Sequence, residues 1–268
     1  MAVYTDQTQR KIEIAQAPQR IISTVPSQTE LLAYLGLERQ VVGITAYCVH
    51  PKDWLQKKTV IGGTKDLQIE KIRQLQPDLI IGNKEENIKE QIETLAKDVP
   101  VWLSDITSVD DALAMLQAVG EVCHRPEPAQ KLVGQINDLR ALAKTELAVP
   151  SLYFIWKEPY MVAGADTFIS AMMQECGLEN KAPQNEQRYP TMSLQEICQS
   201  SAQQIILSSE PYAFTTADAH FLSRETGKKV KIVDGELFSW YGSRMAKAFP
   251  YFQRLHQELA MMHGAFKC

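Results

Sequence analysis

The chain has 268 residues, of which 45% are hydrophobic and 22% are charged, and its formal net charge is -4. This composition is typical of a folded globular protein and argues against disorder. The negative charge argues against a nucleic-acid-binding protein, because such proteins usually carry a basic field.

The sequence contains no stretch of the roughly 20 apolar residues that a membrane-spanning helix needs, so we expect no membrane span. The N-terminus has neither a basic start nor an apolar stretch, which indicates that no secretory signal is present. The cysteines at 48, 123, 176, 198 and 268 lack paired short spacings, which favours reduced thiols. We therefore expect a cytoplasmic monomer as the sequence stands, or a periplasmic one if a signal segment has been removed.

The predicted elements of the first half alternate between strands and helices. A β-branched run at 21–25 predicts a strand, and a helix follows from Thr29 to a stop at Gly36. Residues 67–72 predict a short helix that leads into a buried strand at 77–81, and 99–103 predict a third strand.

The middle of the chain predicts one long helix. From Glu127 to Leu147, apolar residues recur at a spacing of three and four, as in an amphipathic helix. Its length would be roughly 30 Å at 1.5 Å per residue. We interpret this segment as a rigid connection.

The second half repeats the order of the first. Each element of the first half has a counterpart about 130 positions later in the chain. The counterparts are a strand at 152–156, a helix from Thr167, a short helix at 193–198 and strands at 203–207 and 229–233. Such an internal repeat indicates two copies of one architecture. Because all these strands are short continuous apolar runs, helices should cover both faces of mostly parallel sheets.

We therefore predict an α/β fold of two Rossmann-like lobes. Residues 1–122 form the N-terminal lobe, 123–148 the connecting helix and 149–268 the C-terminal lobe. A ligand cleft is expected between the lobes, at the carboxyl ends of the strands. The alternative is one continuous doubly wound domain.

The first candidate ligand-binding residues lie in a loop that comes shortly after residues 41–45. They are Tyr47, Cys48, His50 and Trp54. Thiol and imidazole groups suit zinc, copper or the cobalt of a corrinoid, so Cys48 and His50 are also candidate metal ligands. The alternative is an ordinary loop histidine beside a half-buried thiol.

Further candidates follow other strands. Asn83, Glu85 and Glu86 come after the strand at 77–81, where they either contact a ligand or start a surface helix capped by Asn83. In the second half the candidates are Trp156, Trp240, Tyr241 and Arg244. Aromatic rings can pack on a macrocycle, and Arg244 can bind an anionic side group; the alternative is a place in the core.

Catalytic motifs are absent: the sequence has no nucleophile elbow, Walker loop, dinucleotide fingerprint or zinc-protease motif. We therefore expect a binding protein rather than an enzyme. The alternative is a metal-dependent enzyme built on Cys48, His50 and Glu85.

Several segments together resemble the helical-backbone metal receptor family, the substrate-binding proteins of cobalamin and iron-siderophore ABC importers. The resemblance runs from about residue 10 to 260 and rests on 19–23, 26–32, 35–36, 41–45, 62–63, 69–72, 75–80, 164–169, 176–180 and 240–244. It implies a corrinoid or ferric chelate as ligand, no intrinsic cofactor, and an ABC transporter permease as partner. A cytoplasmic carrier or sensor without such a partner is the alternative.

The resemblance also implies that one glutamate on each lobe docks on the permease. Glu70 matches the first position. An ungapped reading places Gln195 at the second position. Glu196 comes one residue later, which on a helix is a rotation of about 100°, so Glu196 is the candidate only if the register shifts by one residue.

Overall fold

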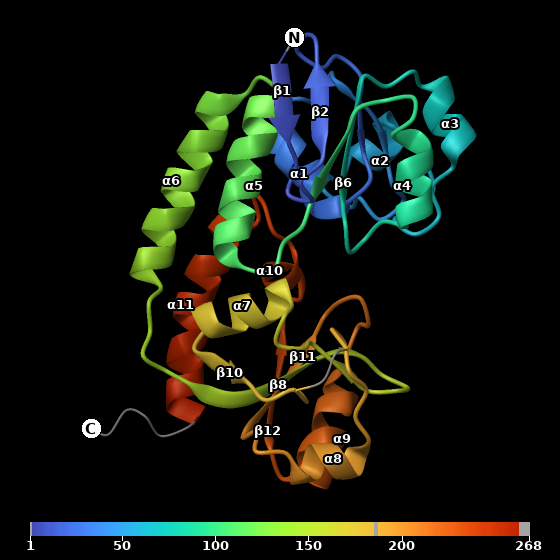
Figure 1. Cartoon of the computed structure of the whole chain (residues 1–268). Coiled ribbons are helices and arrows are strands. Elements are labelled where there is room, and N and C mark those ends of the chain that lie inside the picture. The colour runs from blue at the N-terminus through green and yellow to red at the C-terminus, as the bar shows by residue number, and fades with distance from the viewer. Residues whose placement is uncertain (1, 185–186, 263–268) are drawn as a thin grey trace. The chain divides into compact units, whose positions relative to one another are not determined.

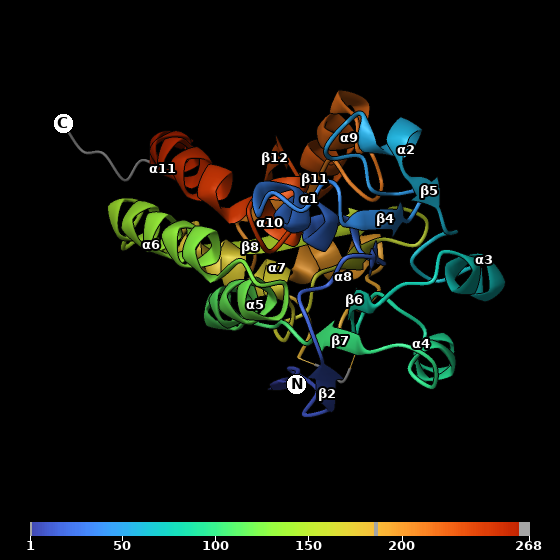
Figure 2. The same cartoon turned by 90° about the horizontal axis from the view of Figure 1, so that it is seen from above.

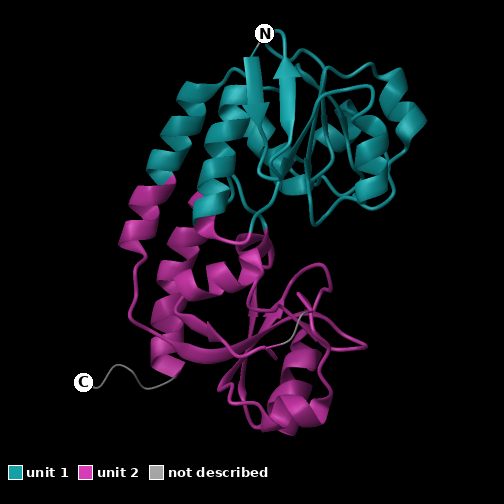
Figure 3. Ribbon diagram, in the orientation of Figure 1, with its two compact units in different colours: residues 1–106, 110–135, 240–244 teal, residues 107–109, 136–239, 245–268 magenta. Residues whose placement is uncertain are grey.

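The computed structural model describes residues 2–184 and 187–262, which form two compact units (Figure 3). Unit 1 takes the described residues of Met1–Ile106, Asp110–Gln135 and Trp240–Arg244. Unit 2 takes those of Thr107–Val109, Ile136–Ser239 and Met245–Cys268, so Cys268 itself lies outside the described residues. The segment Trp240–Arg244 thus belongs to unit 1, although the residues on either side of it belong to unit 2.

Unit 1 contains a parallel sheet of five strands in the order β5-β4-β3-β6-β7, and a separate antiparallel pair, β1 and β2. The strands are β1 (Ala2–Thr5), β2 (Lys11–Ile14), β3 (Ile21–Ser23), β4 (Val41–Ile44), β5 (Thr59–Val60), β6 (Leu79–Asn83) and β7 (Val101–Ser104). The helices up to the middle of the chain are α1 (Pro26–Tyr34), α2 (Trp54–Lys57), α3 (Ile69–Gln74), α4 (Lys89–Leu95), α5 (Val109–Val122) and α6 (Pro126–Leu142).

Helices lie on both sides of this sheet, as the apolar strands require. Figure 2 shows α3 and α4 on one side of β6 and β7, and α5 on the other. On the first side, Ile22 and Ile80 pack with Ile72 of α3 and Ile92 of α4. Trp102 is also fully buried, and it follows Val101 of that cluster, so alternation along β7 points it to the opposite face.

Unit 2 contains a second sheet, with the strand path β10-β8-β11-β12 and with β9 antiparallel to β8 (Figure 1). The strands are β8 (Val149–Trp156), β9 (Met161–Val162), β10 (Leu178–Asn180), β11 (Gln204–Ser208) and β12 (Lys229–Val233). The helices are α7 (Phe168–Glu175), α8 (Leu194–Gln199), α9 (Thr216–Thr226), α10 (Glu236–Ser239) and α11 (Met245–Met262).

The core of unit 2 also has two sides. Leu152 of β8 packs with Ile197 of α8 and Leu222 of α9. Tyr153, the next residue of β8, points to the other face, where its ring centre lies 5.2 Å from that of Phe238 in α10.

The two sheets share one topology, which confirms the predicted α/β fold with mostly parallel sheets. The path β4-β3-β6-β7 in unit 1 corresponds to β10-β8-β11-β12 in unit 2. In unit 1 the chain runs from β3 to β4 on one side and then crosses to β6 and β7 on the other side of β3. In unit 2 it runs from β8 to β10 on one side and then crosses to β11 and β12 on the other side of β8. The strand order therefore reverses between β3 and β6, and between β8 and β11, and ligands of such sheets bind beside this reversal, at the carboxyl ends of the strands.

The long helix of the middle segment is α6, which ends at Leu142 rather than at the predicted Leu147. Residues 143–148 instead lead into β8, whose first residue, Val149, donates its backbone N–H to the Gly177 carbonyl at 3.0 Å. The boundary between the units falls inside α6, after Gln135. Within residues 2–184 and 187–262, no helix combines the length and apolar character that crossing a membrane requires.

Candidate functional site

The carboxyl edge of the unit 1 sheet carries several of the predicted site residues. Tyr47 follows β4 and is 62% exposed. His50 lies further along the same loop and is partly exposed. Glu85 and Glu86 follow β6 and are also partly exposed. These four side chains can reach a ligand at the edge of unit 1.

Cys48 is fully buried in the same loop. Its Sγ lies 3.0 Å from Thr29 Oγ1 and 3.2 Å from Thr45 Oγ1. Burial raises the pKa of the Cys48 thiol, which favours its protonated form. The structure thus assigns Cys48 to packing, in contrast to the predicted ligand or metal contact.

Trp54 and Asn83 are buried as well, in contrast to their predicted ligand contacts. Trp54 is 2% exposed and lies below the Lys58 ammonium group, which is 5.1 Å from its ring centre. Asn83 Oδ1 accepts hydrogen bonds from the backbone N–H groups of Glu85 and Glu86, at 2.8 and 3.0 Å. Asn83 therefore shapes the loop that presents the two glutamates, which is close to the alternative of a capping residue.

The structure does not assemble the metal centre of the enzyme alternative. Among residues 2–184 and 187–262, no group of three or more His, Cys, Asp or Glu side chains is placed to hold a metal ion. Cys48, His50 and Glu85, the three side chains of that alternative, do not form such a group, and a transition metal usually takes at least three protein ligands.

The segment Trp240–Arg244 brings further predicted residues to unit 1. The Trp240 ring meets His50 edge-on, with ring centres 5.5 Å apart. The Arg244 guanidinium lies 4.8 Å from the Trp240 ring centre and donates two hydrogen bonds of 2.8 Å to the Glu30 carboxylate. Because Arg244 is only 6% exposed and paired in this way, it anchors the segment rather than offering a site for an anion.

Tyr241 joins the same segment to a candidate glutamate. Its hydroxyl donates to Glu86 Oε1 at 3.2 Å. Burial, and after it the charge of Glu86, raise the pKa of Tyr241 well above its ordinary value, so the hydroxyl remains a donor. Tyr241 therefore fixes the orientation of Glu86 at the carboxyl edge.

In unit 2, two aromatic rings stand where the strand order reverses. Trp156 ends β8 and is 41% exposed, and Tyr212 follows β11. Their ring centres are 5.7 Å apart in an edge-to-face arrangement, and Tyr212 packs in turn on Phe214 at 4.7 Å. We call Trp156 and Tyr212 the aromatic wall. Tyr212 was not among the predicted site residues, although it comes shortly after the predicted strand at 203–207.

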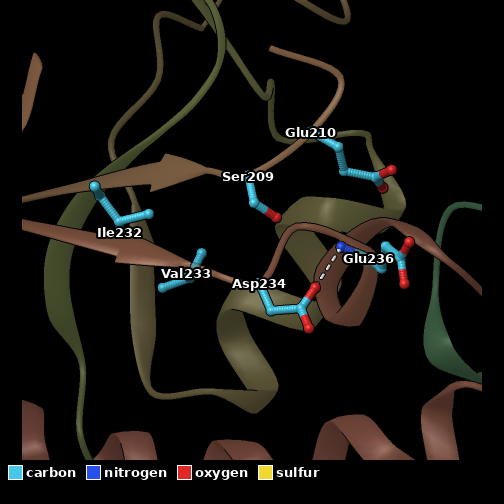
Figure 4. A pocket seen from close by; sticks show the side chains of 6 residues that line it. All are labelled: Ser209, Glu210, Ile232, Val233, Asp234 and Glu236. Atoms are coloured by element: carbon cyan, nitrogen blue, oxygen red, sulfur yellow. Dashed lines mark hydrogen bonds between the residues drawn. The ribbon is translucent and has the colours of Figure 1, made fainter. Parts of the chain in front are cut away.

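An open pocket of about 600 Å³ lies at the carboxyl ends of β11 and β12 (Figure 4). Asp234 Oδ1 accepts a hydrogen bond from the Glu236 backbone at 3.1 Å, and Glu210 Oε1 accepts one from Ser239 Oγ at 2.7 Å. Carboxylates accept hydrogen bonds from amides and attract cations, and they repel anions. The lining residues are Ser209, Glu210, Ile232, Val233, Asp234 and Glu236.

The predicted docking positions lie on two corresponding helices, α3 and α8. Each has six residues, and the fourth, Ile72 or Ile197, is fully buried. Glu70 is the second residue of α3 and its side chain is 78% exposed, beside Arg73 at 2.6 Å. The second residue of α8 is Gln195, so the two helices are in the register of the ungapped reading.

Glu196, the predicted docking residue of unit 2, has a local role. Its Oε2 accepts hydrogen bonds from the Ser193 backbone N–H and hydroxyl, both at 2.7 Å, in a capping box that starts α8. These bonds lower the pKa of Glu196. The carboxylate thus turns back on its own helix.

A family model and a curated relative match most of this chain. Residues 21–233 match the family model described as periplasmic binding protein. The vitamin B12-binding protein of Pectobacterium carotovorum subsp. carotovorum strain PC1 is 26% identical over 238 residues, which span 86% of each chain.

Solved structures show the same fold. The periplasmic vitamin B12 binding protein BtuF of Vibrio cholerae has a TM-score of 0.78 and 21% identity, covering 90% of this chain and 98% of its own. The periplasmic heme-binding protein RhuT from Roseiflexus sp. RS-1, in apo form, has a TM-score of 0.75 and 19% identity, covering 90% and 99%.

Proposed function

We propose that this chain, which belongs to the periplasmic binding protein family, binds a corrinoid of the vitamin B12 type and delivers it to an ABC importer. Membership of the family agrees with the resemblance found in the sequence. The relative from Pectobacterium is named for vitamin B12 binding, which supports the ligand class. The family description supports a place in the periplasm, and a binding role rather than catalysis.

The observation that carries the ligand class is the carboxyl edge of unit 2. The aromatic wall offers Trp156, which is 41% exposed, to a flat ligand. The pocket at the carboxyl ends of β11 and β12, in the same sheet, presents Glu210, Asp234 and Glu236. A corrin ring carries carboxamide groups that can donate to these carboxylates, whereas heme carries carboxylates that they repel. This edge therefore favours a corrinoid over heme.

Titration of the purified protein with cyanocobalamin, dicyanocobinamide, hemin and a ferric hydroxamate tests the proposal. We expect both corrinoids to bind with a Kd below about 1 μM, near -8 kcal/mol, and hemin to bind at least about tenfold more weakly. Tryptophan fluorescence quenching and calorimetry give the constants. If the corrinoids bind no tighter than about 100 μM, the proposed function is wrong.

A further inference from the structure

Asp218 connects two segments of unit 2 at the carboxyl edge of its sheet. It lies in the first turn of α9 and is 9% exposed. Its Oδ2 accepts hydrogen bonds from the Thr215 backbone N–H and hydroxyl, at 2.8 and 2.7 Å. Its Oδ1 accepts a hydrogen bond of 2.6 Å from Lys157 Nζ. One carboxylate thus holds the loop after β8 and the start of α9 together.

These two segments carry the two rings of the aromatic wall. Lys157 directly follows Trp156, and Thr215 comes three residues after Tyr212. Phe214 lies between them and packs on Tyr212, with ring centres 4.7 Å apart. The Lys157–Asp218 ion pair therefore joins the two segments that carry the Trp156 and Tyr212 rings, and it restrains the distance between these rings.

The loop after β8 needs such a connection. Glu158, next to Lys157, has a φ of 64°, in the left-handed region that residues with side chains rarely adopt. Trp156 is more than one-third exposed, so packing alone restrains it weakly. Burial opposes ionisation of Asp218, but the bonds from Lys157 and Thr215 outweigh it and lower its pKa to about 2. The pair is thus charged across the ordinary pH range.

We propose that Lys157 and Asp218 are positioning residues that hold the aromatic wall in the geometry required for ligand binding. This inference rests on the proposed function, because it assigns the wall to the corrinoid site. Preorganised rings lose less conformational freedom when a ligand binds, so losing the ion pair weakens binding without removing a contact. A purely structural role of Asp218, as the partner of Thr215 in the capping box of α9, makes a different prediction, because that capping box does not involve Lys157.

Lys157→Met separates the two roles, because it removes the ion pair and leaves the capping box of Thr215 and Asp218 in place. We expect the Kd for cyanocobalamin to rise about tenfold, as estimated for two rings that must be ordered on binding. Lys157→Arg, which keeps the charge and the donor, should bind within about twofold of the wild type. The thermal unfolding midpoint of each variant shows that the fold is intact.

A double-mutant cycle tests whether Lys157 acts through Trp156. Trp156→Leu should weaken binding by itself, and adding Lys157→Met in that background should raise the Kd by only about threefold, because only the Tyr212 ring is then left to be ordered. The inference is overturned if Lys157→Met binds like the wild type, if Trp156→Leu has no effect, or if the Lys157→Met loss is equally large in the Trp156→Leu background. Wild-type protein that binds no corrinoid would instead remove the proposed function, and this inference with it.

Discussion

The buried imidazole of His256 makes the stability of unit 2 dependent on pH. His256 lies in α11 and is 8% exposed. Burial lowers its pKa, although backbone carbonyls of Glu175 and Cys176 accept hydrogen bonds from the ring. Among the described residues, its Nε2 has no hydrogen-bond partner. A proton added at this nitrogen would therefore be buried without compensation.

A lowered pKa in the folded state means that the unfolded chain binds the proton more readily. The stabilising effect of the neutral ring is present above the unfolded pKa of about 6.5 and is lost as the pH falls through the lower folded value. We expect the free energy of unfolding of the wild type to fall between pH 7.5 and 5.5 more than that of His256→Gln, which keeps a donor for the two carbonyls. Urea denaturation at both pH values measures the difference, and equal slopes for the two proteins would contradict the prediction.

Single residues also show what the sequence could predict of the site. Tyr47, Glu86 and Trp156 were placed at strand ends because the apolar strands themselves were clear. The partner of Arg244 could not be predicted, because Glu30 is 214 positions away along the chain. Burial of Cys48 was equally out of reach, since a single cysteine in a loop carries no periodic signal. Position at an edge is local information, whereas a contact is not.

At the scale of elements, the contact between α5 and α6 depends on Gly120. A Cβ built on Gly120 would lie 2.3 Å from the Ala129 Cβ and 3.0 Å from the Arg125 carbonyl oxygen. Alanine usually stabilises a helix by about 1 kcal/mol over glycine. Here overpacking should reverse that sign, so we expect Gly120→Ala to lower the free energy of unfolding by about 1–3 kcal/mol. Urea denaturation followed by circular dichroism measures it.

The matched control is Gly134, on α6, where a Cβ would meet no heavy atom within 4 Å. Gly134→Ala should raise the free energy of unfolding by roughly 0.5–1 kcal/mol, through helix propensity alone. If Gly120→Ala were as stabilising as Gly134→Ala, close packing between the two helices would not be what requires glycine.

Elements with strong patterns were predicted, and weak ones were not. The strands β6 and β11 were predicted from continuous apolar runs. The hairpin of β1 and β2 was missed, because each strand has only four residues and no residue of β1 is buried. The end of α6 was placed five residues late, because no glycine or proline marks it and the chain turns there only to enter β8. Tertiary demands, rather than local preference, decide such ends.

At the scale of the whole molecule, the internal repeat predicts the shared strand order of the two sheets, but it does not predict which residues stand at corresponding positions. The two sheets share one strand order, as the repeated runs in the sequence suggested. Divergence between the copies appears at single positions, such as Glu70 in α3 and Gln195 in α8. The membership of Trp240–Arg244 in unit 1 could not be predicted, because a chain segment that leaves its own half gives no signal in periodicity.

This divergence predicts an asymmetric interaction with the importer, if the chain docks as its family resemblance implies. Glu70 and Glu196 are both exposed and each is paired within its own helix, Glu70 with Arg73 and Glu196 with Ser193. Gln195, which stands in α8 where Glu70 stands in α3, has no charge. We expect Glu70→Ala to weaken binding to the cognate importer at least about fivefold, because it removes the exposed carboxylate at the predicted docking position. Gln195→Ala should change it less than about twofold, as a neutral contact at a rim. Binding to the detergent-solubilised importer, measured by biolayer interferometry, gives both values.

Glu196→Ala separates capping from docking. Removing the capping box should cost about 1 kcal/mol of stability and leave importer affinity within about twofold, because the carboxylate serves its own helix. The Kd for cyanocobalamin, measured for each variant, controls for damage to the ligand site. Loss of importer binding in Glu196→Ala as large as in Glu70→Ala, at unchanged ligand affinity, would mean that Glu196 leaves its cap to dock. The two copies would then be functionally equivalent despite their difference in register.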